Sequence, residues 1–389
     1  MAACRPRGES MAGVTYKCPN CGSYIAFNPD NQKWKCDSCG SVYDEKTLLA
    51  KAAEYQQQAE LEHAQQEHDH DHSEAHSHTA APEAEAEAAE PTGEAAGDSG
   101  TQVVYHCPSC GSEIMTDETT VATECYYCHN PVVLQGKLTA DMKPDQVLPF
   151  SISKDKAVSR FMEWVAKKRF VPSGFFARDQ VKQMQGVYYP HFVTRCLVNG
   201  SYEGEGLRST VMDSGQYIVT TTEHFAITRR GDITFQNIMR PALKSTDRKL
   251  SDGIHPFPLD EVKPFSGAYL SGFLAERRDL TAAEATADVE EELNGYVSPL
   301  LTQTVHYTTY SGSATAAVRD RQSKYVLLPT WVLTYRKSGE KEPYYYVMNG
   351  RTGEVCGKLP INRGKLRLYG LGLAAICFAA YCVAAYFLF

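Results

Sequence analysis

Cysteine pairs with a Cys-x-x-Cys spacing constrain the folding of this chain more than any other feature of its sequence. Fourteen residues separate the first pair from the second, and the whole arrangement returns 89 positions later with the same gap. An internal repeat of this kind indicates two copies of one structural unit. The two copies use eight of the thirteen cysteines: Cys18, Cys21, Cys36 and Cys39 in the first, and Cys107, Cys110, Cys125 and Cys128 in the second.

The spacing predicts a metal site in each copy. Two cysteines separated by two residues can present both thiolates on one side of a tight turn, and two facing turns form a tetrahedral cage that suits zinc. Gly22, Gly40 and Gly111 directly follow a cysteine and permit a positive φ there, whereas His129 occupies the fourth such position. Each unit is too short to bury its own core, so metal binding would supply its folding energy. We predict two Cys4 zinc ribbons, at residues 14–45 and 101–137, and two zinc ions per chain.

Disulfides, iron and redox-active dithiols are the alternative uses of these cysteines. Disulfides need an oxidising compartment, and the sequence shows no secretory signal. A rubredoxin-like iron site uses similar turns, so the spacing alone leaves iron open. A redox Cys-x-x-Cys motif does not usually occur as two matched pairs, which favours structural zinc. Trp34, between the two pairs of the first copy, is expected to cover the metal cage.

Residues 46–100 are predicted to be an acidic linker between the ribbons, and residues 1–13 a disordered N-terminus. The chain has a formal net charge of −8, and residues 51–100 alone carry one basic and thirteen acidic side chains. Aromatic residues are nearly absent there, so beyond a polar helix over residues 46–67 the segment cannot bury enough surface to fold. A solvated spacer is the simplest interpretation. The alternative is weak metal buffering by His63, His68, His70, His72, His76 and His78.

Residues 142–362 show the patterns of an α+β domain with long antiparallel strands. A helix is predicted over residues 153–168, where apolar residues recur at helical spacing, and the capping box at residues 281–284 predicts another helix to about residue 296. From residue 186 the apolar period changes to two, which is typical of strands. The remaining predicted elements are a short helix at 178–185, strands at 188–205, 217–235, 303–319, 325–335 and 343–348, and turns at 349–350 and 352–353.

No catalytic motif of known mechanism occurs in this domain, so we expect no enzymatic activity. The sequence lacks a Gly-x-x-x-x-Gly-Lys-Ser/Thr phosphate loop, a His-Glu-x-x-His zinc motif and a Gly-x-Ser-x-Gly nucleophile elbow. His191 and His224 lie in strand-like runs and are expected to be hydrogen-bonded residues of a sheet. An enzyme of unrecognised type is the alternative, with the polar candidates His191, Cys196, Glu203, His224, His255 and His306.

The final segment is apolar and long enough to cross a membrane. Residues 368–389 are 22 residues without a charge, and a helix of that length spans about 33 Å, against a hydrocarbon core of roughly 30 Å. Arg363, Lys365 and Arg367 precede it, so the positive-inside rule places the preceding domain in the cytoplasm. We predict one C-terminal transmembrane helix at residues 366–389 that anchors the chain in the cell membrane. A buried core helix is the alternative interpretation.

Several motifs resemble those of a known group of proteins. The Cys-Pro-x-Cys-Gly turns resemble the transcription factor IIB-type zinc ribbon, and the wider chain resembles bacterial zinc-ribbon membrane proteins of unknown role. The resemblance implies a bacterial membrane location and gives no reaction. The motifs that carry it lie at residues 148–150, 186–190, 269–273, 328–331 and 349–357.

Function is therefore predicted at the level of architecture. The leading hypothesis is a membrane-anchored cytoplasmic adaptor or scaffold, without enzymatic activity, that binds protein partners. The alternative from another class is a membrane-tethered regulator that binds nucleic acid. Nucleic-acid-binding ribbons need a basic face, yet the second ribbon carries Glu113, Asp117, Glu118 and Glu124, and the first is nearly neutral. This charge argues against nucleic acid as the main partner.

Overall fold

The computed structural model describes most of the chain outside the linker. The predictions for residues 1–13, for most of residues 46–100 and for residues 178–180 and 182 of the predicted helix at 178–185 fall outside the described residues. Residue 181 is helical, but residues 183 and 184 are not, and Gln185 already belongs to a strand, so the predicted helix ends earlier than expected. The described residues are 16–51, 54, 103–107, 110, 113–125, 128, 130–134, 141–172, 181, 183–213, 215–335 and 344–388.

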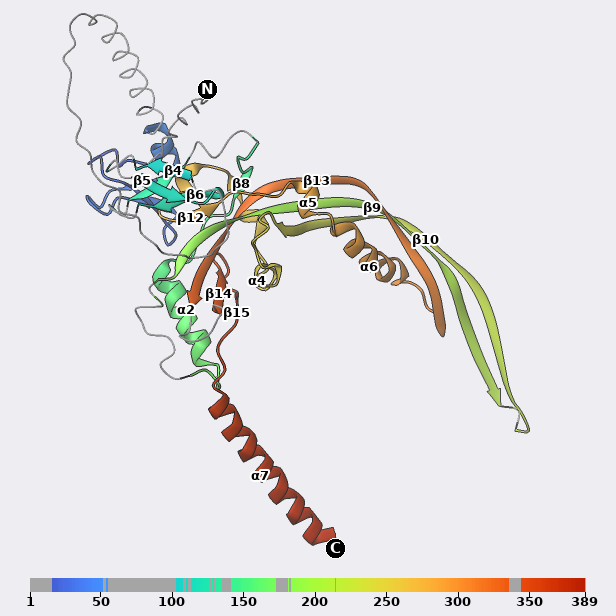
Figure 1. Cartoon of the computed structure of the whole chain (residues 1–389). Coiled ribbons are helices and arrows are strands. Elements are labelled where there is room, and N and C mark those ends of the chain that lie inside the picture. Colours follow the sequence, from blue (N-terminus) through green and yellow to red (C-terminus); the bar gives the residue numbers. More distant parts are fainter. Residues whose placement is uncertain are drawn as a thin grey trace, which may run out of the picture.

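Within these residues, ten strands form one large sheet around which the molecule is built (Figure 1). Three of its strands are long: β9 (Gln185–Asp213), β10 (Ile218–Pro241) and β13 (Thr309–Tyr335). β9 lies between the other two and pairs antiparallel with both. Beyond the core the three strands curve away together, as Figure 1 shows. We call this projecting part the arm and define it as residues 197–213, 218–234 and 309–320.

Helix α6 (Val289–Thr302) packs against the base of the arm. Its residues Val289, Leu293 and Val297 recur at every fourth position and are buried in a cluster with Cys196 of β9. Gly200 permits the close approach of helix and strand, because a Cβ at that position would lie 2.8 Å from Cγ1 of Val297. The amphipathic face of α6 therefore supports the arm where it leaves the core.

The helix predicted over residues 281–296 is in fact two helices. Its capping box is confirmed, with the Thr281 hydroxyl accepting a hydrogen bond from the Glu284 N–H, but helix α5 (Ala282–Ala285) is short. The buried Thr286 ends it, and the Thr286 hydroxyl donates to the carbonyl of residue 282. α6 then starts after Asp288, whose carboxylate forms ion pairs with two arginines. The side-chain requirements of Thr286 and Asp288 override the continuous helical pattern.

The strands predicted at 303–319 and 325–335 are a single strand, β13. Residues 303–308 are not in a strand, because α6 continues to Thr302 and a loop follows. A bulge between Val318 and Asp320 absorbs one residue, so the polar run that follows stays paired with β9. The strands predicted at 188–205 and 217–235 are correct in type but too short. β9 continues to Asp213 in the outer part of the arm, where both faces are exposed, and β10 continues past a bulge between Phe235 and Ile238 to Pro241 in the core.

Shorter elements complete the core at the base of the long strands. Helix α2 (Lys154–Ala166) lies where a helix was predicted, and its Phe161 and Trp164 pack against Tyr346. Ser153 occupies the N-cap position, but its side chain forms no capping hydrogen bond. The other core elements are β8 (Gln146–Val147), β11 (Lys263–Pro264), β12 (Leu274–Glu276), β14 (Tyr344–Asn349), β15 (Val355–Gly357), α4 (Arg248–Asp252), η2 (Leu259–Glu261) and η3 (Gly267–Leu270).

The predicted turn after β14 is present and is organised by one buried amide. The side-chain oxygen of Asn349 accepts hydrogen bonds from the backbone N–H groups of Arg351 and Thr352, at 2.8 and 3.1 Å. Its side-chain nitrogen donates to the carbonyls of Ile254 and Pro256, at 2.9 and 3.0 Å. Asn349 therefore joins the turn to the loop that precedes η2.

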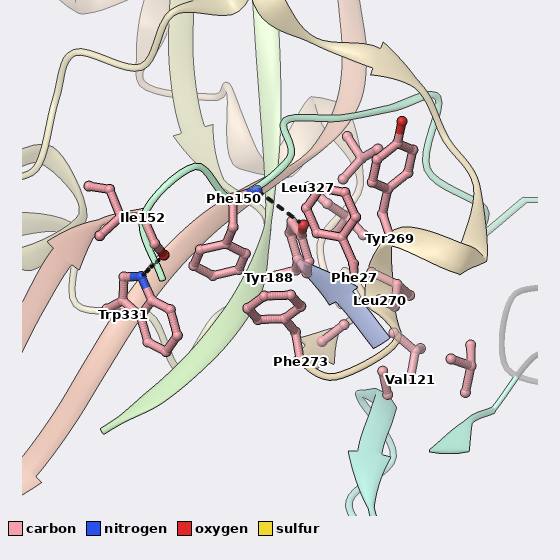
Figure 2. Close-up of a cluster of buried hydrophobic side chains, with 14 of the residues drawn as sticks. Phe27, Val121, Phe150, Ile152, Tyr188, Tyr269, Leu270, Phe273, Leu327 and Trp331 are labelled. Carbon is pink, nitrogen blue, oxygen red and sulfur yellow. Dashed lines mark hydrogen bonds between the residues drawn. The ribbon is translucent and has the colours of Figure 1, made fainter. Parts of the chain in front are cut away.

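Both cysteine units contribute residues to the core of the α+β domain (Figure 2). Phe27 from the first and Val121 from the second belong to the same buried cluster as Phe150 and Tyr188. Within that cluster the ring of Phe150 stacks on the ring of Phe273, with centroids 4.3 Å apart. The two units are thus part of one packed core in addition to forming local cysteine clusters.

Helix α7 (Arg363–Leu388) projects away from this core (Figure 1). Among the described residues it is the single helix long and apolar enough to cross a membrane, and none of its apolar stretch is buried within the chain. Contacts with the core occur at its first turns, where the Tyr369 ring meets Phe170 and the Lys365 amine reaches the carbonyl of Val171. The predicted C-terminal apolar helix is therefore present, and beyond its first turns the described part of the chain leaves its surface exposed.

Candidate metal centres

The first cysteine unit brings four sulfur atoms into one cluster. The Sγ atoms of Cys18, Cys21, Cys36 and Cys39 all lie within 4.8 Å of one another. Each Cys-x-x-Cys turn is closed by backbone hydrogen bonds, from the Gly22 N–H to the carbonyl of residue 18 and from the equivalent glycine to the carbonyl of residue 36, both at 2.9 Å. The turns face each other across strands β1 (Ala26–Asn28), β2 (Lys33–Lys35) and β3 (Val42–Tyr43).

Backbone conformation explains the glycines that follow the cysteines. Gly22 and Gly40 have φ angles of +71° and +73°, as the sequence predicted. A Cβ at either position would meet no atom within 4 Å. Glycine is therefore favoured there by its positive φ rather than by lack of space. The equivalent expectations for Gly111 and His129 lie outside the described residues.

The second unit repeats the cluster on a different framework. Sγ of Cys107 lies 3.7 Å from Sγ of Cys128, and Sγ of Cys110 lies 3.7 Å from Sγ of Cys125. The first pair follows strand β4 (Val103–His106), which forms a hairpin with β5 (Glu113–Thr116). The second pair joins β6 (Thr120–Glu124) to β7 (Pro131–Val133). The cluster therefore connects two hairpins.

The hairpin β6–β7 is part of the large sheet. β6 pairs with β12, and β12 pairs in turn with β9. The Arg277 guanidinium, just after β12, also donates a hydrogen bond of 2.8 Å to the carboxylate of Glu118, just before β6. This bond strengthens the contact between β6 and β12. A metal ion in the second cluster would thus hold the β4–β5 hairpin, which lies outside that sheet, against the domain.

The first unit is attached to the domain through Trp34. Its indole N–H donates a hydrogen bond of 2.8 Å to the carbonyl of Ala268 in η3. The centroid of its ring lies 5.1 Å from the ring centroids of Phe27 and of Tyr269. The Phe27 N–H also donates a hydrogen bond of 3.0 Å to the carbonyl of Ser271. Trp34 was expected to cover the metal cage, and the contacts that the structure gives for it are with the domain and with Phe27. Its large apolar ring and single donor are both satisfied by the domain, so it is the docking residue of this unit.

The chemistry of the sulfur atoms suits a soft divalent cation. In each cluster two sulfurs belong to buried residues and all four cysteines are free, with Sγ–Sγ separations of 3.5–3.7 Å in the closest pairs, well beyond a disulfide bond of roughly 2.05 Å. Burial raises the pKa of Cys36 to about 11 and that of Cys128 to about 12. Hydrogen bonding to Ser41 lowers the pKa of Cys39 to about 6. A bound cation would stabilise the buried thiolates, which are costly without one.

One of the enzyme candidates lines a cavity. A cavity of about 390 Å³ lies between α4 and the long strands, and His191 forms part of its wall. Nε2 of His191 lies 2.9 Å from the Ser251 hydroxyl, and Nδ1 lies 3.2 Å from the carbonyl of Tyr189. Burial lowers the pKa of His191 to about 4, so the ring is neutral. Ser251 was missed from the sequence because no motif joins it to a histidine 60 positions away.

The other enzyme candidates are dispersed. Glu203 and His224 lie exposed on the arm, where they contact Arg230 and Glu205 respectively. His306 is exposed in the loop before β13. Two candidates are inside the protein: Cys196 is buried under α6, and His255 has a buried Nε2 atom without a hydrogen-bond partner among the described residues. These side chains do not form one site.

Comparison with known proteins gives one informative match. No family model matches the chain, so none confirms the resemblance to the transcription factor IIB-type ribbon. No solved structure matches it either. The uncharacterized protein YdjG of Bacillus subtilis (strain 168) is 32% identical over 376 residues, which cover 94% of this chain and 96% of that protein. With this identity along nearly the whole of both chains, the protein belongs to the family of YdjG.

Proposed function

We propose that this protein is a zinc-binding adaptor held at a membrane by α7. The observation that carries the proposal is the exposed apolar surface of α7, which the described part of the chain does not cover. The two four-cysteine clusters support a structural metal at each ribbon. Four thiolates leave no open position for a substrate, and closed sites of this kind are structural.

Zinc would fasten two peripheral pieces to the domain. In the first unit it would hold together the two turns that frame Trp34. In the second it would join the β4–β5 hairpin to the large sheet. Zinc is favoured over iron because four-cysteine sites in small ribbons are predominantly zinc sites. The two metal ions would therefore shape the surface that a partner meets.

Membrane anchoring has a direct test in the tail. Ala379→Arg places a charge near the middle of α7, which costs about 2.5–3.5 kcal/mol on insertion scales. Ala379→Leu is the matched control. We expect the arginine variant to be partly lost from carbonate-washed membranes and a chain lacking residues 366–389 to be released completely. Retention of the truncated chain after the carbonate wash would show that α7 is not the anchor.

The basic residues in the first turns of α7 support a cytoplasmic location for the folded part. Arg363, Lys365 and Arg367 lie at the start of the helix, on the side that the positive-inside rule assigns to the cytoplasm. Protease added to intact spheroplasts should leave the folded part undigested until the membrane is permeabilised. Digestion before permeabilisation would place the domain outside.

An adaptor needs a surface for a protein partner, and the arm provides one. β10 pairs with β9 on one side, and among the described strands no other pairs with its outer edge. An open strand edge is a template for a partner's strand. We expect a protein partner to fractionate with membranes in cells that make the full chain and to become soluble when residues 366–389 are deleted. If no protein changes its distribution, the adaptor role is wrong.

A second candidate function is favoured by the cavity beside His191. The neutral ring is placed to accept the Ser251 proton at Nε2, while Nδ1 is oriented by the Tyr189 carbonyl. This is the arrangement of a nucleophile and its general base. An enzyme of this type would be labelled at Ser251 by a fluorophosphonate, and labelling would be lost in His191→Gln. Absence of label in the folded protein would show that Ser251 is not an activated nucleophile, and the enzymatic alternative at this cavity would be wrong.

A further inference from the structure

The tip of the arm exposes an unusual concentration of apolar side chains. At the end of the β9–β10 hairpin five of them are between 49 and 73% exposed. The tip, which we define by these residues, consists of Val211, Met212, Tyr217, Ile218 and Val219. Exposed apolar groups gathered at one place mark an interaction site.

The apolar residues lie on both faces of the ribbon. Met212 is directly opposite Val219 and shares one face with it, while Ile218 is opposite Asp213, on the other face. Val211, two residues before Asp213, lies on that second face because side chains alternate along a strand. A hairpin that docks on a flat protein surface buries one face. A tip that carries apolar side chains on both faces is better suited to an apolar environment that surrounds it on all sides.

Polarity changes in steps along the hairpin. Above the tip, Ser209 and Thr222 are opposite one another, as are Thr210 and Thr221, so two successive pairs carry hydroxyl groups. The next pair is charged, Arg208 with Glu223. From the apolar residues towards the core the order is therefore apolar, hydroxyl, charged, as in the passage from acyl chains through the interface to the headgroups and water. The turn beyond them carries the exposed Asp213 and Gln216. Tyr217 places an amphipathic ring in the apolar part, as interfacial tyrosines do.

The arm leaves the core sideways and then curves until its end points in much the same direction as α7 (Figure 1). Figure 1 shows both the arm's end and α7 extending below the core in that view. A membrane entered by α7 therefore lies on the side to which the tip points. We propose that the tip inserts into the lipid bilayer and forms a second membrane contact. The inference rests on the proposed anchoring by α7 and extends it.

Backbone hydrogen bonding limits the depth of insertion. β13 begins at Thr309, opposite Leu207, so beyond this pair the hairpin has two strands and two unpaired edges. Unpaired N–H and C=O groups cannot be buried in the hydrocarbon core. On β9 the apolar residues are Val211 and Met212, and the polar turn begins at Asp213, so the end of β9 from Val211 covers about 7–10 Å along the strand. This length matches the roughly 5–10 Å reached by interfacial segments. The tip therefore lies in the interface and does not cross the bilayer.

A tryptophan at the tip can report contact with lipid. Tyr217→Trp places the fluorophore at the tip, and Tyr310→Trp is the matched control, because Tyr310 is also exposed on the arm but lies opposite Gly206. Seven residues separate Gly206 from Asp213, which is about 23 Å along the strand. Of the three native tryptophans, Trp34 and Trp331 are buried and Trp164 is half-buried, so the parent chain gives the background emission. The full chain would be reconstituted in phosphatidylcholine vesicles with and without bromine on the acyl chains.

We expect brominated lipid to quench the Tyr217→Trp emission by at least twofold relative to the parent chain and to leave the Tyr310→Trp emission unchanged. Flotation of the same vesicles reports anchoring separately. Flotation without quenching at residue 217 overturns the tip contact and leaves the anchor intact. Failure to float overturns both. A blue shift that depends on protein concentration, without quenching by bromine, would show that a second copy of the chain covers the tip instead.

Discussion

Replacing Trp34 with phenylalanine should loosen the first cysteine unit from the domain without unfolding the domain. The substitution removes the indole N–H that donates to Ala268 and two ring carbons from a site that is 1% exposed. The lost hydrogen bond is worth about 0.5–1.5 kcal/mol, because the Ser271 N–H still donates to the same carbonyl. The two buried carbons contribute about 1.6 kcal/mol. The docked state should therefore lose about 2–3 kcal/mol.

Hydrogen exchange measured by mass spectrometry resolves this loss by segment. A change of about 2–3 kcal/mol raises the population of the undocked state roughly 30- to 150-fold. Peptides covering residues 24–36 and 266–273 should exchange faster by that factor, while peptides from β9 and β13 should keep their parent rates. Trp331→Phe is the matched control, because it removes the same atoms and a similar hydrogen bond, from Trp331 to Ile152 at 3.0 Å, inside the domain.

Two results would refute the reasoning on Trp34. Unchanged exchange at residues 266–273 in Trp34→Phe would mean that Trp34 does not hold the unit on η3. Equal acceleration at residues 24–36 in Trp34→Phe and Trp331→Phe would mean that the unit and the domain open together as one cooperative body. The metal content of both variants must equal that of the parent chain, because loss of the metal would by itself accelerate exchange in the cysteine unit.

Two further predictions concern buried polar groups of the domain. Asn349→Leu removes the four hydrogen bonds that a fully buried side chain makes with backbone groups and should lower stability by at least about 3 kcal/mol. Asn349→Asp keeps the acceptor and should lose less. A lower urea midpoint for both variants would support this, whereas an unchanged midpoint would contradict it. His191 has a folded-state pKa of about 4 against an ordinary 6.5, so its neutral form is favoured in the folded protein and stability should fall as pH decreases from about 6.5 towards 4. Burial lowers the pKa of His255 in the same direction, despite the nearby Asp252. The melting temperature should therefore drop less between pH 7 and 5 in His191→Gln than in the parent, and equal drops would argue against a buried neutral His191.

The sequence could predict the features that depend on local spacing. Both cysteine clusters and the positive φ of Gly22 follow from residues close together in the chain. The period-two pattern of β9 indicated a strand because alternate side chains are buried between residues 192 and 202. The ends of the long strands could not be predicted, because β9 stays paired in the outer arm where both faces are exposed, and β10 continues past a bulge that breaks the alternation. The apolar residues of the tip are thus invisible to a pattern based on burial.

Long-range contacts account for the features that the sequence left open. Trp34 donates to a carbonyl 234 positions away, so nothing near it in the sequence distinguishes a docking residue from a lid over the metal. β6 joins the large sheet through β12, which makes the second cysteine unit part of the domain. Ser251 and His191 meet because α4 packs beside β9. Each of these depends on tertiary packing, which single-sequence patterns do not encode.

The metal content of the full chain purified in detergent tests the central claim most directly. Two intact cysteine clusters predict two zinc ions per chain by elemental analysis. The double variant Cys18→Ser, Cys36→Ser should retain one zinc, from the second cluster, and Cys356→Ser, which lies outside both clusters, should retain two. One zinc or fewer in the parent chain, or iron in stoichiometric amount, would contradict the account of two structural zinc sites.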